Sequence, residues 1–149
     1  MNAERVTLRE GGEVPLDALV DLYEAVGWSA YTAPERVGDL QRALRNSTYL
    51  VTAWDGDCLV GLARGLSDDV SVFYLQDILV RPTYQRQGIG ARLLRNCLER
   101  YAHVRLHILL TDEDEQVVRF YEALGFCDTS TLQKHRLRAF VRMPGVDLG

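Results

Sequence analysis

Gln85-Arg86-Gln87-Gly88-Ile89-Gly90-Ala91 is the most informative stretch of this chain. It follows an apolar, strand-like run, residues 73–80, that is closed by Arg81-Pro82, and it precedes a helix-like stretch, residues 91–98. A glycine-opened helix placed directly after a strand and a turn leaves several backbone N–H groups unpaired at one point. These donors lie at the positive end of the helix macrodipole. The stretch therefore predicts a site for a phosphate or pyrophosphate group.

Length and composition indicate which kind of protein contains that site. The chain has 149 residues, which predicts a single domain, 1–149, with one hydrophobic core. Its 47% hydrophobic and 26% charged residues are typical of a soluble globular protein. The net charge of −4 argues against nucleic acid or an acidic membrane as a partner, so an anionic ligand has to be bound by local groups.

The cellular compartment and metal content are inferred from what the sequence contains. The amino-terminal stretch, residues 1–8, lacks the apolar core of a secretory signal, and no apolar run approaches membrane-spanning length. Three widely spaced cysteines outside any C-x-x-C pair suit reduced, buried thiols in a cytoplasmic protein. The histidines show no ligand spacing with them, so we expect no metal site.

The hydrophobic pattern predicts a mixed α/β fold with a central sheet and helices on both faces. Helical spacing covers 16–26, and Pro34 is expected to open a second helix. Thr111-x-x-Asp114 resembles a capping box for the last helix, which Gly125 should end in the left-handed conformation. The expected strands are 6–8, 49–54, 58–64, 72–80, 104–110 and 137–143.

At this point the chain resembles the GCN5-related N-acetyltransferase (GNAT) superfamily. The family signature Gln/Arg-x-x-Gly-x-Gly/Ala is present as residues 85–90, after a strand that ends in Val80-Arg81-Pro82. Further along comes the phrase Phe120-Tyr121-Glu122-Ala123-Leu124-Gly125-Phe126. The order of elements agrees over nearly the whole chain. Other phosphate motifs fit worse, because a dinucleotide fingerprint needs a third glycine where Leu93 stands, and a Walker Gly-Lys-Ser/Thr is absent.

The resemblance implies acetyl-CoA as the acyl donor. It also implies a mixed, mostly antiparallel central sheet whose one parallel pair of strands, 72–80 and 104–110, splays apart. In the family, strand groups freed by the splay pair with the pantetheine arm of the cofactor, and one N–H can stabilise a developing oxyanion. Asp114 stands where many relatives carry an Asn that contacts this arm. The cofactor-binding residues implied in this way are Ile78, Leu79, Val80, Gln85, Arg86, Gln87, Gly88, Ile89, Gly90, Ala91, Arg92 and Asp114. Gln85 is equally compatible with a solvated turn.

Two residues are the catalytic candidates. The resemblance places Tyr121, the leading candidate, as the proton donor to the leaving thiolate, and the alternative is a half-buried aromatic on an amphipathic helix. Asp77 is an acidic residue inside an apolar strand, which is costly unless it is paired or used. It is interpreted either as a general base or ammonium ligand, or as a carboxylate paired to an arginine. Gln76 and His107 are weaker alternatives, and strict strand alternation allows only one of Gln76 and Asp77 to face the cleft.

The acceptor pocket is expected at the break between the first two helices, where the family usually forms it. Trp28 and Tyr31 are the predicted substrate-binding residues, whereas Tyr23 is expected in the core. An aromatic wall there suits an amine with an apolar or cationic body.

These observations predict an N-acetyltransferase that moves an acetyl group from acetyl-CoA to a primary amine of a small molecule or peptide, within a ternary complex. The alternative is a non-catalytic acyl-CoA-binding sensor or partner-binding module. A third hypothesis is a structural domain without a CoA site. A homodimer is compatible with the sequence, but nothing in residues 128–149 requires it.

Overall fold

The computed structural model of the protein describes residues 3–149, so the first two residues of the amino-terminal stretch lie outside it. Two compact units are distinguished, one ending at Leu110 and the other comprising Thr111–Gly149, and each is described by itself. In the described part of the chain, no helix is both long enough and apolar enough to cross a membrane.

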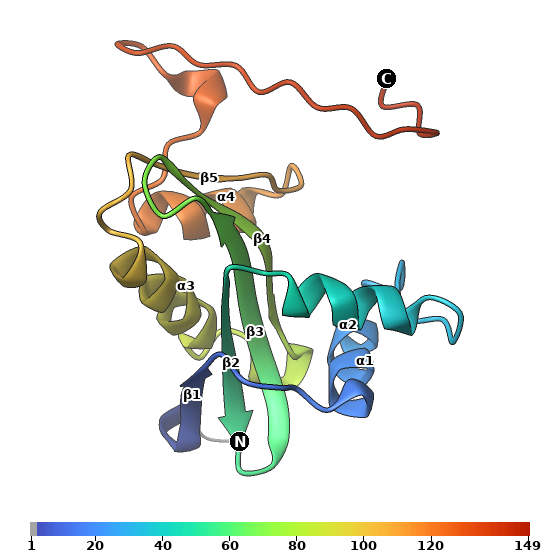
Figure 1. The fold of residues 1–149 in the computed structure, drawn as a ribbon. Helices are drawn as coiled ribbons and strands as arrows, with labels where there is room; N and C mark the ends of the chain where they lie inside the picture. Colours follow the sequence, from blue (N-terminus) through green and yellow to red (C-terminus); the bar gives the residue numbers. More distant parts are fainter. Residues whose placement is uncertain (1–2) are drawn as a thin grey trace. The chain divides into compact units, whose positions relative to one another are not determined.

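The first unit is built on a five-stranded sheet whose strands lie in chain order (Figure 1). Neighbouring strands are antiparallel from β1 to β4, and β4 and β5 are parallel. The predicted mixed, mostly antiparallel sheet is therefore confirmed. The strands are β1 (Val6–Glu10), β2 (Tyr49–Asp55), β3 (Cys58–Ser67), β4 (Val72–Val80) and β5 (Leu106–Leu109).

Helices cover both faces of this sheet, as the hydrophobic pattern predicts. Figure 1 shows α1 and α2 on one face and α3 on the other. Leu22 of α1 and Leu40 of α2 are buried in one cluster with Leu62 of β3, and Leu93 of α3 is fully buried. Burying each such side chain stabilises the fold by about 1.5–3 kcal/mol. The helical elements of this unit are η1 (Ala3–Arg5), α1 (Leu16–Ala25), α2 (Val37–Arg45), η2 (Pro82–Tyr84) and α3 (Ile89–Arg100).

The second helix begins later than the sequence predicts. Pro34 was expected as its first residue, but α2 starts at Val37. The intervening residues form a separate turn, in which the N–H of Arg36 donates to the carbonyl oxygen of Ala33 at 2.8 Å. Because this bond spans three residues rather than four, the turn is tighter than an α-helix and precedes it.

A β-bulge in β4 decides where the sheet opens. Arg64 of β3 is opposite Asp77, but the next residue, Gly65, is opposite Leu75, so Gln76 is an extra residue in β4. A Cβ at Gly65 would overlap the ring of Phe73 and the carbonyl oxygen of Tyr74, so only glycine fits beside the bulge.

The pairing of β4 with β5 stops at the bulge. β5 pairs with Val72–Leu75 only, whereas the part of β4 beyond the bulge continues to pair with β3 through residues 61–64. The predicted splay of the parallel pair is therefore confirmed. It leaves one edge of residues 78–80 without a strand neighbour among the described residues.

The second unit contains α4 (Glu115–Ala123) and η3 (Thr129–Thr131). The predicted strand 137–143 is wrong, because the described structure has neither strand nor helix after Thr131. A strand needs a partner for its backbone groups, and residues 137–143 pair with none in this structure. The prediction of a single domain over residues 1–149 stays a prediction.

The three cysteines are all free, but only one matches the expectation of a buried thiol. Cys97 of α3 is fully buried, whereas Cys58 and Cys127 are exposed. Cys58 begins a strand next to the tight turn at Gly56, and Cys127 follows the end of α4, where solvent reaches the chain.

Candidate active site

The turn before α3 has the backbone geometry of an anion site. Arg86 and Gly88 both have positive φ, 63° and 82°, and Gly88 is the N-cap of the helix. The N–H of Arg92 makes the first α3 bond, to the Gly88 carbonyl at 3.1 Å, so the N–H groups of residues 89–91 precede the hydrogen-bond ladder. Left-handed residues alternating with others form concavities of N–H groups that bind anions.

Space above the turn is open. A Cβ built on Gly88 meets no atom within 4 Å, so glycine is required there for its conformation rather than for lack of room. An anion can therefore approach the N–H groups of the first turn of α3 closely.

Side chains of the signature anchor the turn to the sheet. The Tyr84 hydroxyl donates to Asp55 at 2.6 Å, and the Gln85 amide donates to the carbonyl oxygen of Val80 at 2.9 Å. The Arg92 guanidinium donates to the carbonyl oxygen of Val6 at 2.9 Å. Gln85 is exposed, as a solvated turn residue would be, but its amide nitrogen is engaged by the chain and is not free to reach a ligand. It fixes the turn against the end of β4. The predicted contacts of Gln85 and Arg92 with the cofactor stay predictions.

Asp77 lies in a compact hydrogen-bonded cluster. Its Oδ2 accepts a hydrogen bond from the Tyr23 hydroxyl at 2.8 Å and another from Nε of Arg64 at 2.7 Å. The Asp77 and Arg64 side chains are only 13% and 12% exposed, so little water screens the pair. Of the two interpretations of Asp77, the arginine-paired carboxylate describes this structure, and its role as a base or ammonium ligand stays a prediction.

The electrostatics of the cluster keep Tyr23 neutral and Arg64 charged. Burial, reinforced by the Asp77 carboxylate, raises the pKa of Tyr23 far above its usual range. Burial by itself would lower the pKa of Arg64, but the attraction and hydrogen bond of Asp77 more than offset this, and the net pKa is raised. The cluster thus holds one positive and one negative charge.

The sequence pattern did not point to Arg64, and it indicated only a core position for Tyr23. Tyr23 is indeed buried, yet its hydroxyl reaches the site. An arginine inside the apolar run of β3 was the available signal for Arg64. Its partner, however, is set by the β3–β4 register, which a single sequence does not display.

A pocket of about 470 Å³ lies beside this cluster. Gln76 and Asp77 both line it, which corrects the expectation that only one of them faces the cleft. The bulge is the physical reason, because an extra residue breaks strand alternation. The pocket is lined by Tyr23, Trp28, Ala30, Tyr31, Arg36, Asp39, Leu40, Arg42, Ala43, Asn46, Arg64, Gln76 and Asp77.

Trp28 and Tyr31, the residues predicted to bind the acceptor substrate, both line this pocket. The end of α1 explains the position of Trp28. Gly27 has a φ of 80°, which ends α1 as predicted, and the N–H of Trp28 then donates to the carbonyl oxygen of Tyr23 at 2.9 Å. The rings of Tyr23 and Trp28 meet edge to face with centroids 6.3 Å apart. Trp28 and Tyr31 are both partly exposed, as ligand-contacting aromatics must be.

His107, a weaker alternative for the general base, is hydrogen-bonded to the backbone away from the pocket. Its Nε2 lies 2.7 Å from the carbonyl oxygen of Tyr101, so this nitrogen carries the proton and donates. His107 is not among the residues that line the pocket.

In the second unit, Asp114 itself is the N-cap of α4. Its Oδ1 accepts hydrogen bonds from the N–H groups of Gln116 and Val117, at 2.8 and 3.2 Å. The predicted capping box has Thr111 as the N-cap and Asp114 in the first turn of the helix. This is wrong, because the N-cap is Asp114 itself. Aspartate is a better N-cap than threonine, and the helix starts after it. The predicted contact of Asp114 with the cofactor stays a prediction.

Tyr121 is buried in α4, with its ring edge-on to Phe120 and Phe126 at centroid distances of 5.1 and 5.8 Å. Gly125, with a φ of 94°, ends the helix in the left-handed conformation, and Phe126 packs back on Tyr121, as predicted. Burial raises the pKa of Tyr121 to about 12. The phenol therefore keeps its proton at neutral pH, as a proton donor must.

Comparison with known proteins identifies the family. Residues 16–126 match the model of the acetyltransferase (GNAT) family, and the chain belongs to this family. It is 32% identical over 136 residues to histone acetyltransferase TAP1 of Glycine max, a match that covers 83% of this chain and 56% of that protein. The chain thus spans about half the length of these curated relatives.

Solved structures agree with this assignment. A GNAT-family acetyltransferase from Streptococcus pneumoniae TIGR4 superposes with a TM-score of 0.76 at 35% identity, over 93% of this chain and 99% of that one. AAC(6')-Iy, in complex with the bisubstrate analogue CoA-S-monomethyl-acetylneamine, has a TM-score of 0.66 over 90% of this chain and 99% of its own. At 18% identity, the second likeness shows the fold alone.

Proposed function

We propose that this protein is an N-acetyltransferase that transfers the acetyl group of acetyl-CoA to a primary amine. The observation that carries the proposal is the path of β4. The strand leaves β5 after Leu75, runs on without a strand neighbour on that edge among the described residues, and leads through η2 into the turn that presents the N–H groups of α3. One continuous surface thus offers strand groups followed by an anion site.

The residues present fit acetyl-CoA. The open space above Gly88 and the N–H groups of residues 89–91 suit its diphosphate. The unpaired edge of residues 78–80 suits the amide-rich pantetheine arm, because buried strand groups need hydrogen-bond partners. Acetyl-CoA supplies the activated acetyl thioester, and a backbone N–H of this edge would donate to the thioester carbonyl oxygen.

The chain must also manage two protons. A lysine-like amine with a pKa near 10.4 is neutral only about once in a few thousand molecules at pH 7, so its proton has to be removed. Both hydrogen bonds that Asp77 accepts within the described chain end on Oδ2, which leaves Oδ1 for the substrate ammonium or for a bridging water. We assign removal of the amine proton to Asp77 and protonation of the leaving thiolate to Tyr121.

Replacing Tyr121 by Phe tests the enzyme against its rival, a non-catalytic acyl-CoA sensor. Turnover, followed as free thiol release, should fall by about ten- to ten-thousand-fold, while the Kd for acetyl-CoA stays unchanged. Tyr49→Phe is the matched control, because it also removes a buried hydroxyl, one that donates to Glu10 at 2.6 Å.

The outcomes separate the hypotheses. Wild-type protein that binds acetyl-CoA but acetylates no amine would support the sensor. Equal turnover by Tyr121→Phe and wild type would remove Tyr121 from the mechanism. Absence of saturable acetyl-CoA binding would refute the proposal itself.

A further inference from the structure

The acceptor pocket is lined by more positively charged than negatively charged side chains. Three arginines and two aspartates line it, which leaves one positive charge in excess. These residues are Arg36, Arg42, Arg64, Asp39 and Asp77. The aspartates would be the natural ligands of a cationic substrate, so their existing partners decide how attractive the pocket is to cations.

Both oxygens of Asp39 are already engaged. Oδ2 accepts from Nε of Arg36 and Oδ1 from Nη2 of Arg42, each at 3.0 Å. Asp77 is held in turn by Arg64. Each acidic group of the pocket therefore has an arginine partner within the chain, and once the acceptor amine lies at Oδ1 of Asp77, a second or third ammonium group would meet no free carboxylate oxygen.

The arginines, by contrast, retain free donors. The hydrogen bonds of Arg64 within the described chain use Nε, to Asp77, and Nη1, to the Ser47 hydroxyl at 3.3 Å, which leaves Nη2 for a ligand. Arg42 reaches Asp39 through one nitrogen only and its side chain is 74% exposed. A guanidinium group with spare donors is the side chain best suited to a carboxylate.

We propose that the acceptor is an amine that also carries a carboxylate, that is, an amino-acid-like compound, and that Arg42 and Arg64 recognise the carboxylate. This inference rests on the proposed acetyl transfer and names its substrate class. The amine end lies toward Asp77, and an apolar side chain lies against Trp28. The volume of about 470 Å³ is in the range of pockets for small molecules rather than for folded proteins.

Arg42 is the residue on which to test this. Arg36 has a second structural partner, because its guanidinium lies 4.7 Å from the ring centroid of Tyr31, and Arg64 holds the buried pair with Asp77. Among the residues that the structure describes, Arg42 pairs only with Asp39, at an exposed position. Its removal changes the pocket charge with little cost to the fold.

The experiment measures kcat/KM with acetyl-CoA for two matched pairs of amines, tryptophan against tryptamine and phenylalanine against phenethylamine, with spermidine as a polycation. Wild type should prefer the carboxylate-bearing member of each pair by about tenfold or more, since charge-assisted hydrogen bonds are lost with the other. Arg42→Gln should reduce this preference about two- to fivefold, through KM rather than kcat. Asp39→Asn, which releases Arg42, should increase it.

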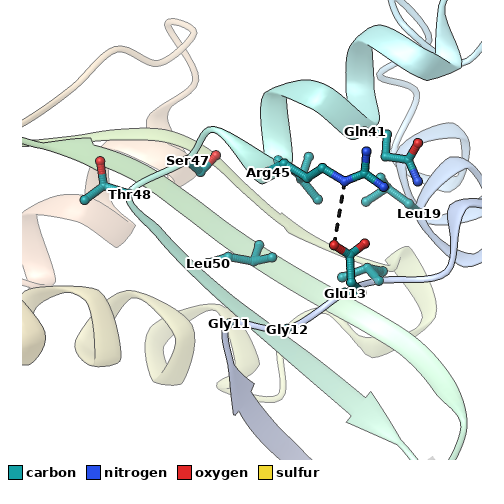
Figure 2. A pocket seen from close by; sticks show the side chains of 11 residues that line it. Gly11, Gly12, Glu13, Leu19, Gln41, Arg45, Ser47, Thr48 and Leu50 are labelled. Carbon is teal, nitrogen blue, oxygen red and sulfur yellow. Dashed lines mark ion pairs between the residues drawn. The ribbon is translucent and has the colours of Figure 1, made fainter.

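Arg45→Gln is the control. Arg45 lies on the same helix, α2, but lines a different pocket, where it pairs with Glu13 at 3.6 Å (Figure 2). Arg45→Gln removes the same charge from the same helix as Arg42→Gln, but outside the acceptor pocket, so the substrate preference should not change. The preference of wild type should also weaken as salt is added, because the arginine–carboxylate attraction is screened.

The results distinguish this inference from the proposed function. Acetylation of tryptamine or spermidine as efficiently as tryptophan would overturn the substrate class and leave acetyl transfer standing. An equal loss of preference in Arg45→Gln would overturn the role of Arg42. Acetyl-CoA binding without acetylation of any amine would refute both the proposed function and this inference. As a readout without turnover, tryptophan should raise the Tm of the CoA-bound protein more than tryptamine does.

Discussion

The turn before α3 and the pocket around Asp77 are two parts of one candidate site, but they are built in different ways. The turn uses backbone N–H groups of residues 85–91, which are contiguous in the chain. The pocket uses charged and aromatic side chains from α1, α2, β3 and β4. A backbone site depends on conformation at one or two glycines, whereas a side-chain site depends on which strands and helices become neighbours.

If the turn is a backbone site, a change at Gly88 should have the largest effect of all. Gly88→Val forces a β-branched residue into a left-handed conformation that costs about 1–2 kcal/mol even for an ordinary L-residue. The turn should then change shape and lose at least two hydrogen bonds to the diphosphate, each worth about 1.5–3 kcal/mol. We expect the Kd for acetyl-CoA, measured by calorimetry, to rise about 100-fold or more.

Gly56→Val is the control for that change. Gly56 also has a positive φ, 59°, and open space around its Cβ position, but it lies in the turn between β2 and β3. It should cost stability and leave the Kd unchanged. Equal weakening of acetyl-CoA binding by both variants would mean that the turn has no special role.

The next largest effect is expected in the pocket, where removing one member of the Arg64–Asp77 pair should lower the stability of the fold. Asp77→Asn leaves a mostly buried guanidinium without its counter-charge, which should lower the free energy of unfolding by about 2–4 kcal/mol in a urea titration. The double variant Arg64→Met/Asp77→Leu should recover most of that loss without recovering activity.

The exposed pair Glu115–Arg119 of α4 serves as the comparison. Its N–O distance is 3.3 Å and its side chains are 75% and 89% exposed. Glu115→Gln should cost at most about 0.5 kcal/mol. A similar small cost for Asp77→Asn would show that the pocket pair is no better shielded than a surface pair.

A smaller change in the same cluster is Tyr23→Phe. The ring remains in the core and only the hydrogen bond to the Asp77 carboxylate is lost, so the free energy of unfolding should fall by about 1.5 kcal/mol. Acetyl-CoA affinity should not change, because the turn before α3 contains no atom of this cluster. Weaker cofactor binding in this variant would show that the two parts of the site are coupled.

The effect that is smallest at neutral pH concerns the far end of α3, because it appears only at alkaline pH. Burial raises the pKa of the Cys97 thiol from 9.0 to about 12. The pKa of this thiol is higher in the folded protein than in the unfolded chain. The neutral, buried thiol therefore contributes its full stability below pH 9, and this contribution is lost as the pH rises from 9 to 12. Cys97→Ala should make the decline of Tm over this range less steep, whereas Cys58→Ala, at an exposed site, should not.

Much of the backbone could be predicted because it depends on neighbours in the chain. Gly27, Gly88 and Gly125 each have the positive φ expected of helix-end glycines. The amphipathic stripe of α3 buries Leu93 and Leu94 as predicted. The errors at Thr111, Pro34 and the 137–143 strand arose where two local signals competed or where a partner strand was required.

The resemblance to the family, the order of elements up to α4 and the turn that opens α3 could all be inferred from the amino-acid sequence, because glycine conformation and hydrophobic spacing act over a few residues. Tertiary structure alone decided that Arg64 neutralises Asp77, that Tyr23 joins them, and that a bulge turns both Gln76 and Asp77 into one pocket. Cross-strand register sets these contacts between residues far apart in the chain. A charge pair forms only where packing brings its members together and excludes the water that would otherwise separate them.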